Sequence, residues 1–394
     1  MTRVAIFTSH PIQYQVPWFR ALARQQALET EVVFSYIPDA VEQGVGFGEA
    51  FTWDIPLLSG YNSRVLKTYS LPNFLSGSVR RWSLSIGNAL QDLRPDVALI
   101  LGWQEPPLIQ ALVACRRRNI PIILRGESNS LRKRPKLVTA VHRAYLKNCD
   151  AVLAIGEANA NFYHEAGVPN NKIISAPYFV ENERFINGAA KLCGDRLALR
   201  ERWSIPADAT CFAFVGKLEP KKRILDFLKG LELAHRQGGK VAGLVVGNGS
   251  DMEAAETFVR QNNLPVTFAG FLNQSEIHSA YVASDAIVLP SDYGETWGLV
   301  VNEAMASSIP AIVSDRVGCA NDLVVHGKTG LVFPFGDVTA LATKLSELSA
   351  DQSLRERLAT AAIERVSSNY TIDHAVARTL EAIKLVTPCF KSKA

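Results

Sequence analysis

The sequence predicts an α/β fold with two doubly wound domains, each built on a mostly parallel sheet. Short apolar runs recur along both halves of the chain, and each is followed by a longer amphipathic stretch. This alternation is typical of parallel strands that are buried on both faces between helices. The chain has 394 residues, more than the roughly 250–300 residues at which a single core stops growing. We therefore expect two cores.

Examples of the predicted strands in the first half are Val4–Phe7, Val97–Leu101, Ile120–Leu124 and Ala151–Ile155. Those of the second half are Cys211–Val215, Val241–Val246, Val266–Phe268, Ala286–Leu289 and Ala311–Ser314. Polar stretches place the seam near residues 180–205. The predicted parts are a first domain at 1–185, a linker and connecting helix at 186–205, a second domain at 206–370, and a helix and tail at 371–394 that pack back toward the first domain.

Ligands of open parallel sheets bind beyond the carboxyl ends of the strands. Two such domains that face each other across a central cleft suit an enzyme with one substrate on each domain. The same fold class also serves binding proteins, so the fold alone leaves both functions open.

The composition is that of an ordinary globular protein, with 47% hydrophobic and 20% charged residues and a formal net charge of +4. So mild a charge predicts no nucleic-acid partner. No two cysteines have the spacing of a metal or redox site, which favours reduced thiols at positions 115, 149, 193, 211, 319 and 389. The first apolar run is too short for a signal peptide, and no run reaches the roughly 18 residues of a membrane span. We expect a cytoplasmic protein.

The stretch Asp285–Met305 predicts a strand, a loop and a helix that begins near Thr296–Gly298 and ends before Pro310. The first amides of a helix form an anion site, here those of Trp297, Gly298 and Leu299. Gly298 carries no side chain that would obstruct a phosphate.

Two carboxylates accompany this predicted helix, Glu295 at the end of the loop and Glu303 inside the helix. Eight residues of helical rise would separate them by about 12 Å. Such a span suits hydrogen bonds to hydroxyls at the two ends of a sugar–diphosphate–ribose chain. A plain helix start, with Glu295 near the positive end of the dipole and Glu303 exposed, explains the spacing equally well.

Two glycine turns follow predicted strands of the second half. Gly216 and Lys217 come directly after one strand, with Lys222 five residues further on, so that both ammonium groups can reach a diphosphate. A solvated basic turn is the alternative. The turn Gly247-Asn248-Gly249 follows the next strand, and taken alone it is a weak signal.

The combined pattern resembles glycosyltransferase family 4. The motifs that carry the resemblance are Gly216-Lys217-Leu218 with Lys222, Gly247-Asn248-Gly249, Phe268-Ala269-Gly270-Phe271, Pro290-Ser291 with Glu295 and Glu303, and His326-Gly327-Lys328-Thr329-Gly330-Leu331-Val332. It covers residues 178–370 strongly and the first half loosely. The resemblance implies the GT-B fold, with two Rossmann-like domains, and transfer of a sugar with retention of its anomeric configuration.

The resemblance also implies a role for each matching residue. Lys217 and Lys222 bind the donor diphosphate, Glu295 contacts the transferred sugar, and these three are the catalytic candidates. Glu303 binds the ribose, and the backbone around Phe271 meets the base. The full donor-binding set is Gly216, Lys217, Lys222, Gly247, Asn248, Phe271, Glu295, Thr296, Trp297, Gly298, Leu299 and Glu303.

The implied chemistry requires stabilisation of the leaving nucleoside diphosphate. Lys217, Lys222 and the helix N-terminus supply it without a metal, and the chain contains no Asp-x-Asp triplet. We therefore expect no metal and no cofactor, with a nucleotide diphosphate sugar as co-substrate. The acceptor hydroxyl attacks on the face from which the phosphate leaves, and the departing phosphate oxygen takes its proton.

This chain departs from the family pattern at several positions. Lys217 stands where the family usually has Arg, which replaces a two-pronged donor with a point charge. Arg223 and Ser308 stand where Gly is common. The loop Gly318–Asp322 replaces a more glycine-rich loop that ends in Glu.

The first domain is expected to bind the acceptor, a glycan or a lipid-linked saccharide. The candidates for this contact are His10, Trp103, Glu105, Arg125 and Glu127, all in loops or strand ends of the predicted sheet. Structural explanations stay open for four of them: a histidine bonded at a turn, a packing tryptophan, and a salt bridge between Arg125 and Glu127.

A basic run, Arg132-Lys133-Arg134-Pro135-Lys136, precedes apolar residues at helical spacing. Such a helix can dock on an anionic membrane from the cytoplasmic side, although a solvated face is the commoner outcome. Two rival functions also remain: a sugar-nucleotide epimerase of the same fold, and a noncatalytic protein that binds a nucleotide sugar.

Overall fold

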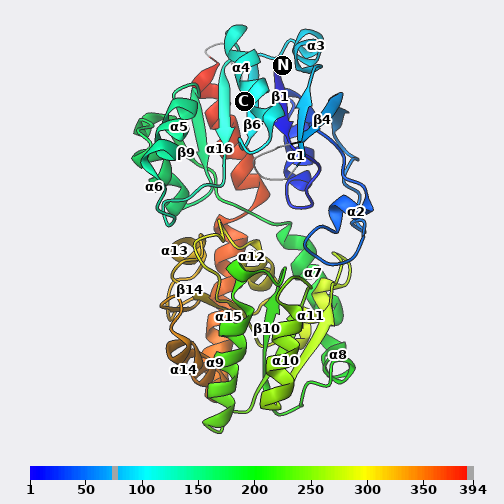
Figure 1. Ribbon diagram of the computed structural model, residues 1–394, viewed down its shortest axis with the longest axis vertical. Helices are drawn as coiled ribbons and strands as arrows, with labels where there is room; N and C mark the ends of the chain where they lie inside the picture. The colour runs from blue at the N-terminus through cyan, green and yellow to red at the C-terminus, as the bar shows by residue number, and fades with distance from the viewer. Residues whose placement is uncertain (73–78, 388–394) are drawn as a thin grey trace. The chain divides into compact units, whose positions relative to one another are not determined.

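The computed structural model describes residues 1–72 and 79–387, which form two compact α/β units (Figure 1). The first unit consists of Met1–Asp39, Pro56–Tyr178 and the segment from Ile372 onward. The second consists of Phe179–Thr371 and a short early segment, Ala40–Ile55. This early segment lies inside the predicted span 1–185 but belongs to the second unit. The predicted acceptor and donor roles of the two domains stay predictions.

The first unit is built on a seven-stranded parallel sheet with the order β3-β2-β1-β6-β7-β8-β9. Its strands are β1 (Thr2–Thr8), β2 (Leu28–Phe34), β3 (Asn62–Val65), β6 (Val97–Leu101), β7 (Ile122–Arg125), β8 (Ala151–Ala154) and β9 (Ile173–Ser175). Its helices are α1 (Val16–Ala23), α3 (Ile86–Leu93), α4 (Pro106–Arg117), α5 (Lys136–Leu146), α6 (Glu157–Glu165) and α16 (Ile372–Val386). Strands β4 (Thr68–Pro72) and β5 (Val79–Ser83) pair antiparallel beside it.

The second unit is built on a six-stranded parallel sheet with the order β12-β11-β10-β13-β14-β15. Its strands are β10 (Thr210–Val215), β11 (Val241–Val246), β12 (Val266–Gly270), β13 (Ala286–Leu289), β14 (Ala311–Ser314) and β15 (Gly330–Phe333). Its helices are α2 (Ala40–Gln43), α7 (Asn182–Leu192), α8 (Arg196–Arg202), α9 (Ile224–Arg236), α10 (Met252–Asn262), α11 (Ile277–Ala283), α12 (Leu299–Ala306), α13 (Ala320–Leu323), α14 (Val338–Ala350) and α15 (Gln352–Asn369).

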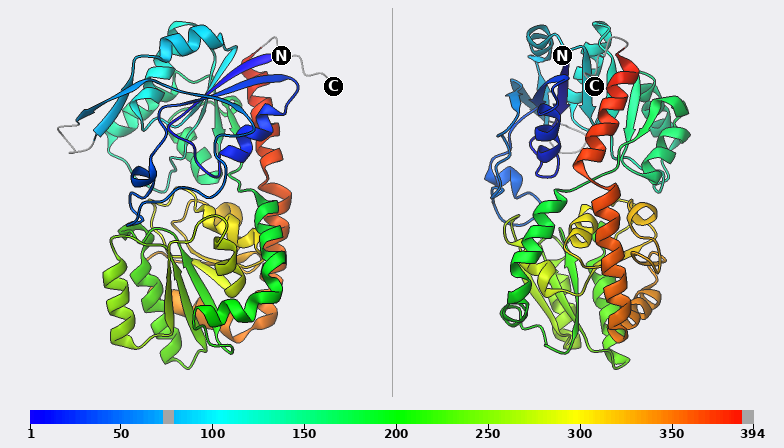
Figure 2. Two further views of the ribbon diagram at one scale, coloured as in Figure 1. Left: turned by 90° about the vertical axis from the view of Figure 1, so that its right-hand side faces the viewer. Right: turned by 180° about the vertical axis from the view of Figure 1, so that it is seen from behind.

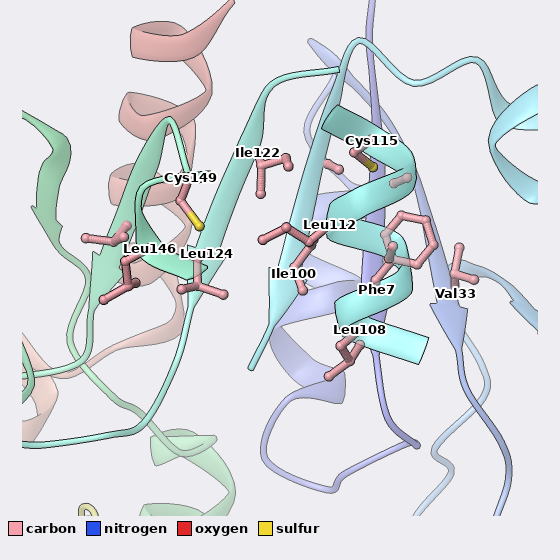
Figure 3. Close-up of a cluster of buried hydrophobic side chains, with 14 of the residues drawn as sticks. Phe7, Val33, Ile100, Leu108, Leu112, Cys115, Ile122, Leu124, Leu146 and Cys149 are labelled. Carbon is pink, nitrogen blue, oxygen red and sulfur yellow. The ribbon is translucent and has the colours of Figure 1, made fainter. Parts of the chain in front are cut away.

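The apolar runs of the sequence become the cores of these sheets. In the first unit, Leu108 and Leu112 on α4 point toward Ile100 and Phe7 on the strands beneath (Figure 3). Each of these side chains is at least 95% buried, and removing one such side chain from water stabilises the fold by roughly 1.5–3 kcal/mol. Strands buried on both faces need continuous apolar runs, which is why the sequence revealed them.

The predicted fold class is confirmed, and the predicted strands all fall on observed ones. The strands that went unpredicted are β2, β3, β4, β5, β9 and β15. β2 shows the reason, because Glu29 and Glu31 interrupt its apolar residues. Helix α16 packs against α1 and β8 of the first unit, as Figure 2 shows in red. Residues 388–394 of the predicted tail, including Cys389, lie outside the described residues.

Candidate functional site

The predicted donor residues gather at the carboxyl edge of the second unit's sheet. Strands β10 and β13 are neighbours and run parallel, so the loops that follow them emerge at the same edge. The loop after β10 carries Gly216, Lys217 and Lys222, and the loop after β13 carries Glu295. Residues separated by more than 70 positions therefore meet at one place.

An ion pair joins two of the three catalytic candidates, because the Lys222 ammonium donates a hydrogen bond to a carboxylate oxygen of Glu295. Each side chain is only 13% exposed. A side chain at Gly216 would approach the Lys222 ammonium to 3.7 Å, so the glycine leaves the space beside that cation open. A phosphate that contacts Lys222 would thus lie close to the carboxylate predicted to bind the sugar.

The Lys217 side chain, on the same loop, contacts the early segment Ala40–Ile55 of the second unit. Its ammonium donates a 2.6 Å hydrogen bond to the carbonyl of Val45 and lies 4.5 Å from the ring centroid of Phe47. Burial is the largest influence on its pKa and lowers it from the usual value; Glu219 opposes the shift, and Lys221 and Lys222 add to it. Neither Val45 nor Phe47 is among the residues predicted from the sequence. The signal available was the run of alternating glycines in Gly44-Val45-Gly46-Phe47-Gly48.

Helix α12 begins one to three residues later than predicted, at Leu299. Gly298 precedes it with a φ of 102°, no side chain caps the first turn, and the first turn holds no acidic residue. The positive end of the helix is therefore not neutralised by its own side chains. The predicted reason for Gly298 needs correction: a Cβ there would come within 2.7 Å of Leu289, so backbone conformation and packing require the glycine.

The turn before α12 is braced from two directions. Trp297 is 3% exposed, and its indole Nε1 donates a 2.8 Å hydrogen bond to Asn302. Its side chain therefore belongs to the core, and only its backbone remains for a ligand. The amides of Gly318 and Cys319 donate to the carbonyls of Glu295 and Trp297 at 3.1 and 3.0 Å. The loop Gly318–Asp322, which differs from the family pattern, thus holds the backbone of Thr296 and its neighbours in place.

Glu303 lies on α12 and accepts a 2.6 Å hydrogen bond from the hydroxyl of Tyr281. Part of the side chain reaches the surface, but burial of the carboxyl group raises its pKa, against smaller opposing effects of Tyr281 and Arg184. The predicted 12 Å spacing from Glu295 does not apply, because Glu295 precedes the turn at Gly298 and is not helical.

The remaining donor candidates follow β11 and β12. The amide of Gly247 donates a 2.7 Å hydrogen bond to the carbonyl of Gly270, which ties the two loops together. Asn248 accepts a 2.8 Å hydrogen bond from the amide of Gly249. The Phe271 ring is surrounded by other aromatic rings: Phe47, Phe51 and Trp53, with centroids at 5.1, 4.2 and 6.3 Å.

The acceptor candidates lie at the carboxyl ends of strands in the first unit. After β1, His10 hydrogen-bonds to Ser9 at 3.0 Å, and its ring centroid lies 5.3 Å from that of Tyr36. Glu105 precedes α4 and does not cap it with its side chain. Trp103 packs on the core with its ring 5.5–6.0 Å from those of His142, Tyr145 and Phe162, which is the packing role left open for it.

Arg125 ends β7 and is 7% exposed. It donates to the carbonyl of Ala176 at 3.3 Å, and its guanidinium lies 5.0 Å and 5.2 Å from the ring centroids of Trp18 and Tyr178. Burial lowers its pKa. The carboxylate of Glu127 accepts a hydrogen bond from the Tyr178 hydroxyl. Arg125 and Glu127 are thus linked through Tyr178.

Two of the positions where the resemblance expects glycine adopt a left-handed backbone. Arg223 has a φ of 59° and Ser308 a φ of 62°. Only glycine takes this conformation without a steric penalty. The fold has therefore kept the glycine-type backbone while the side chains have changed.

Within residues 1–72 and 79–387, no group of three or more His, Cys, Asp or Glu side chains lies close enough together to hold a metal ion. No helix in the same ranges is both long and apolar enough to cross a bilayer.

Residues 195–365 match the protein family Glycosyl transferases group 1. This matched stretch contains all of the predicted donor residues, from Gly216 to Glu303. Curated relatives align over part of the chain. A D-inositol 3-phosphate glycosyltransferase of Stackebrandtia nassauensis is 34% identical over 46% of this chain and 43% of its own. An N-acetyl-alpha-D-glucosaminyl L-malate synthase of Bacillus anthracis is 25% identical over 59% of each chain. This chain thus spans about half the length of these relatives.

Solved structures match along nearly the whole chain. A glycosyltransferase of Rickettsia africae aligns over 98% of both chains with a TM-score of 0.75 and 14% identity. Anabaena Alr3699/HepE, solved in complex with UDP and glucose, aligns over 98% of this chain and 100% of its own with a TM-score of 0.74 and 14% identity. These likenesses confirm the GT-B fold, with two Rossmann-like units.

Proposed function

We propose that the protein is a retaining, metal-independent glycosyltransferase of family 4 that moves a hexose-type sugar from a nucleotide diphosphate sugar to a hydroxyl acceptor. The observation that supports this most is the ion pair of Lys222 with Glu295 in the loop before the uncapped start of α12. Lys217 lies on the same loop as Lys222. Two ammonium groups and a helix N-terminus suit a diphosphate, and a carboxylate suits the hydroxyls of the sugar next to it. The bound UDP and glucose of the Anabaena structure make the same ligand class reasonable here.

In the proposed reaction, the bond between the anomeric carbon and the β-phosphate oxygen breaks, and the acceptor oxygen bonds to that carbon on the same face. The departing phosphate oxygen takes the proton of the acceptor hydroxyl. Lys222 and Lys217 stabilise the negative charge that develops on the phosphate. Glu295 holds the sugar and balances the charge of Lys222 when the donor is absent.

A transfer assay tests this proposal. The protein is incubated with UDP-, GDP-, ADP- and dTDP-hexoses and with a panel of glycan and lipid-linked acceptors, in EDTA. We expect turnover with one donor class, an undiminished rate in EDTA, and a product with the donor's anomeric configuration by NMR. Inversion would contradict the mechanism, and a rate abolished by EDTA and restored by Mg²⁺ or Mn²⁺ would contradict metal independence.

The same incubations without acceptor separate the two rival functions. An epimerase would isomerise a sugar nucleotide by itself. A noncatalytic protein would bind a nucleotide sugar and give no turnover with any acceptor. Either result would replace the transferase proposal.

We also propose that α5 docks on an anionic membrane at its cytoplasmic face, which would bring a lipid-linked acceptor within reach. Leu137 and Val141 on this helix are 77% and 60% exposed, and the exposed cations Arg132, Lys133 and Lys136 lie at its start. Exposed apolar side chains beside cations suit an anionic lipid surface. Pelleting with vesicles tests this: recovery that is equal with neutral and anionic vesicles, or unchanged by Leu137→Glu, would contradict it.

A further inference from the structure

The early segment of the second unit, Ala40–Ile55, lies along the loops that carry the donor residues (Figure 2, dark blue). We call this segment the strap. It consists of α2, a glycine-rich turn at 44–48, and an extended piece with Phe51 and Trp53. It contacts Lys217 and Phe271, two members of the predicted donor set.

The strap contacts the Lys217 ammonium through two neutral groups. The Val45 carbonyl accepts a hydrogen bond from one of the three N–H groups of this ammonium. The centroid of the Phe47 ring lies 4.5 Å from Lys217 Nζ. A ring in this position contributes roughly 0.5–2 kcal/mol of attraction to a cation. The ammonium group is therefore held in place while it keeps an N–H donor for an anion.

Two glycines let the strap approach the donor residues closely. Gly46 has a φ of 84°, and a Cβ there would lie 2.9 Å from Lys217 Nζ. Gly48 has a φ of 78°, and a Cβ there would lie 2.9 Å from Asn248 Nδ2. Conformation and clearance both call for glycine at these two positions, so the main chain fits against two donor-set side chains.

The rest of the strap is anchored on the loop that follows β12. The Phe51 ring packs on Phe271 with centroids 4.2 Å apart. Asn273 donates a 2.8 Å hydrogen bond to the Thr52 carbonyl, and the Ser275 amide donates a 3.0 Å hydrogen bond to Asp54. These contacts fix the position of the turn at 44–48 relative to Lys217.

A lysine at this position needs such support more than an arginine would. The lysine stem is flexible and its ammonium is a point charge, whereas the guanidinium fork is pre-organised for a diphosphate. Fixing a flexible side chain before the ligand arrives reduces the entropy lost on binding. Burial, which lowers the pKa of Lys217, also strengthens its attraction to an anion.

We propose that the strap is a positioning element of the donor site: Val45 and Phe47 hold the Lys217 ammonium for the diphosphate, and Phe51 holds the strap. This inference rests on the proposed function, because it assumes that Lys217 binds a diphosphate. Phe47 acts through Lys217, so its contribution should vanish when Lys217 is absent.

A double-mutant cycle on the full chain tests this dependence. The probe is whichever of UDP, GDP, ADP and dTDP binds the wild type most tightly in calorimetry. We expect Phe47→Ala to raise Kd about fivefold to tenfold, in line with the loss of one cation–π contact. In the Lys217→Ala background the same change should alter Kd less than about twofold. Phe47→Tyr, which keeps a ring over the ammonium, should restore binding close to that of the wild type.

Matched control variants distinguish a loss of Lys217 positioning from a general disturbance of the fold. Val41→Ala lies in the same strap, and its side chain is 69% exposed, so Kd should not change. Gly46→Ala should raise Kd, because the new Cβ displaces the ammonium. Gly60→Ala is its control, with a similar φ of 87° and a Cβ that meets a flexible cationic side chain, Arg20. If Phe47→Ala fails to fold, Phe51→Ala, which loosens the strap from Phe271, takes its place in the cycle.

Three results would overturn the inference alone: a wild-type Kd for Phe47→Ala, an equal loss with and without Lys217, or tighter binding in Phe47→Ala. The last result would mean that the strap covers the site and competes with the donor. A wild type that binds none of the four nucleotides would overturn the inference together with the proposed function. Affinity that Lys217→Ala reduces but Phe47→Ala does not would leave the proposed function intact.

Discussion

The carboxyl edges of the two parallel sheets both hold buried or half-buried cations, but they use them differently. In the second unit, Lys222 pairs with one carboxylate, and Lys217 is held by a carbonyl and a ring. Both ammonium groups lie beside glycine turns. In the first unit, the Arg125 guanidinium lies over two aromatic rings and donates to a main-chain carbonyl.

The surroundings of a cation at a strand end therefore indicate whether it can bind a ligand. A cation beside a glycine turn and a helix N-terminus has space for an anion on at least one side. A guanidinium packed among aromatic rings is part of the core, whatever its position on the sheet. Lys217 and Lys222 therefore remain strong donor candidates, whereas Arg125 is first of all a structural residue of the first unit.

The largest expected effect is on catalysis at the second unit's edge. Lys222→Met should lower kcat at least 100-fold, because it removes a cation that stabilises the leaving phosphate (about 2.7–4 kcal/mol). It also leaves the Glu295 carboxylate without its ion-pair partner, so the melting temperature should fall. Steady-state kinetics and thermal unfolding measure the two effects.

The double variant Lys222→Met with Glu295→Gln serves as control. It should recover most of the lost melting temperature, because no unpaired charge remains, but none of the lost turnover. If turnover recovers together with stability, Lys222 contributes only to the stability of the fold. Lys222 would then be a structural residue, as Arg125 is.

The next largest effect is on the stability of the first unit. Arg125→Ala should lower the free energy of unfolding by about 2–4 kcal/mol, because it removes buried contacts with Trp18 and Tyr178 and the hydrogen bond to the Ala176 carbonyl. The Kd for nucleoside diphosphates should stay at the wild-type value. Denaturant titration and calorimetry decide this. Normal stability with weakened acceptor use would instead make Arg125 a ligand-binding residue.

Acid sensitivity should reside largely in the second unit. Burial lowers the pKa of His278 to about 4 from 6.5; Arg184 adds to the shift and Asp54 opposes it. The unfolded chain therefore binds more protons than the folded one, and stability falls as the pH drops from 6.5 toward 4, by up to about 3 kcal/mol. His278→Gln should flatten this dependence in unfolding measured at several pH values. If the free energy of unfolding depends on pH equally in His278→Gln and the wild type, other groups cause the acid sensitivity.

The smallest effect concerns the left-handed residues of the second unit. Ser308→Gly should raise the free energy of unfolding by about 0.5–1 kcal/mol, because glycine adopts a φ of 62° without strain and this gain exceeds the added entropy of the unfolded chain. Ser367→Gly, at an exposed position of α15, is the control, and it should lower stability by a similar amount. A loss of stability in Ser308→Gly would mean that the side chain makes a compensating contact.

The sequence predicted the fold well because the central strands are continuous apolar runs. The bounds of β6, β11, β13 and β14 coincide with the predicted runs. Most of the predicted donor residues could be proposed from the sequence because they lie in short motifs after strands. The strap was not found, because its meaning depends on contacts such as that between Val45 and Lys217, which lie 172 positions apart. The pairing of Lys222 with Glu295 was hidden for the same reason, since spacing gives no distance between separate loops.

The central claim is that a diphosphate binds between the two ammonium groups and the start of α12. A crystal structure of the full chain with its tightest-binding nucleoside diphosphate tests it directly. We expect phosphate oxygens within about 3.2 Å of Lys217 Nζ, Lys222 Nζ and an amide of the turn before Leu299. Phosphates bound at another edge of the sheet, with Lys222 still paired only to Glu295, would contradict the account.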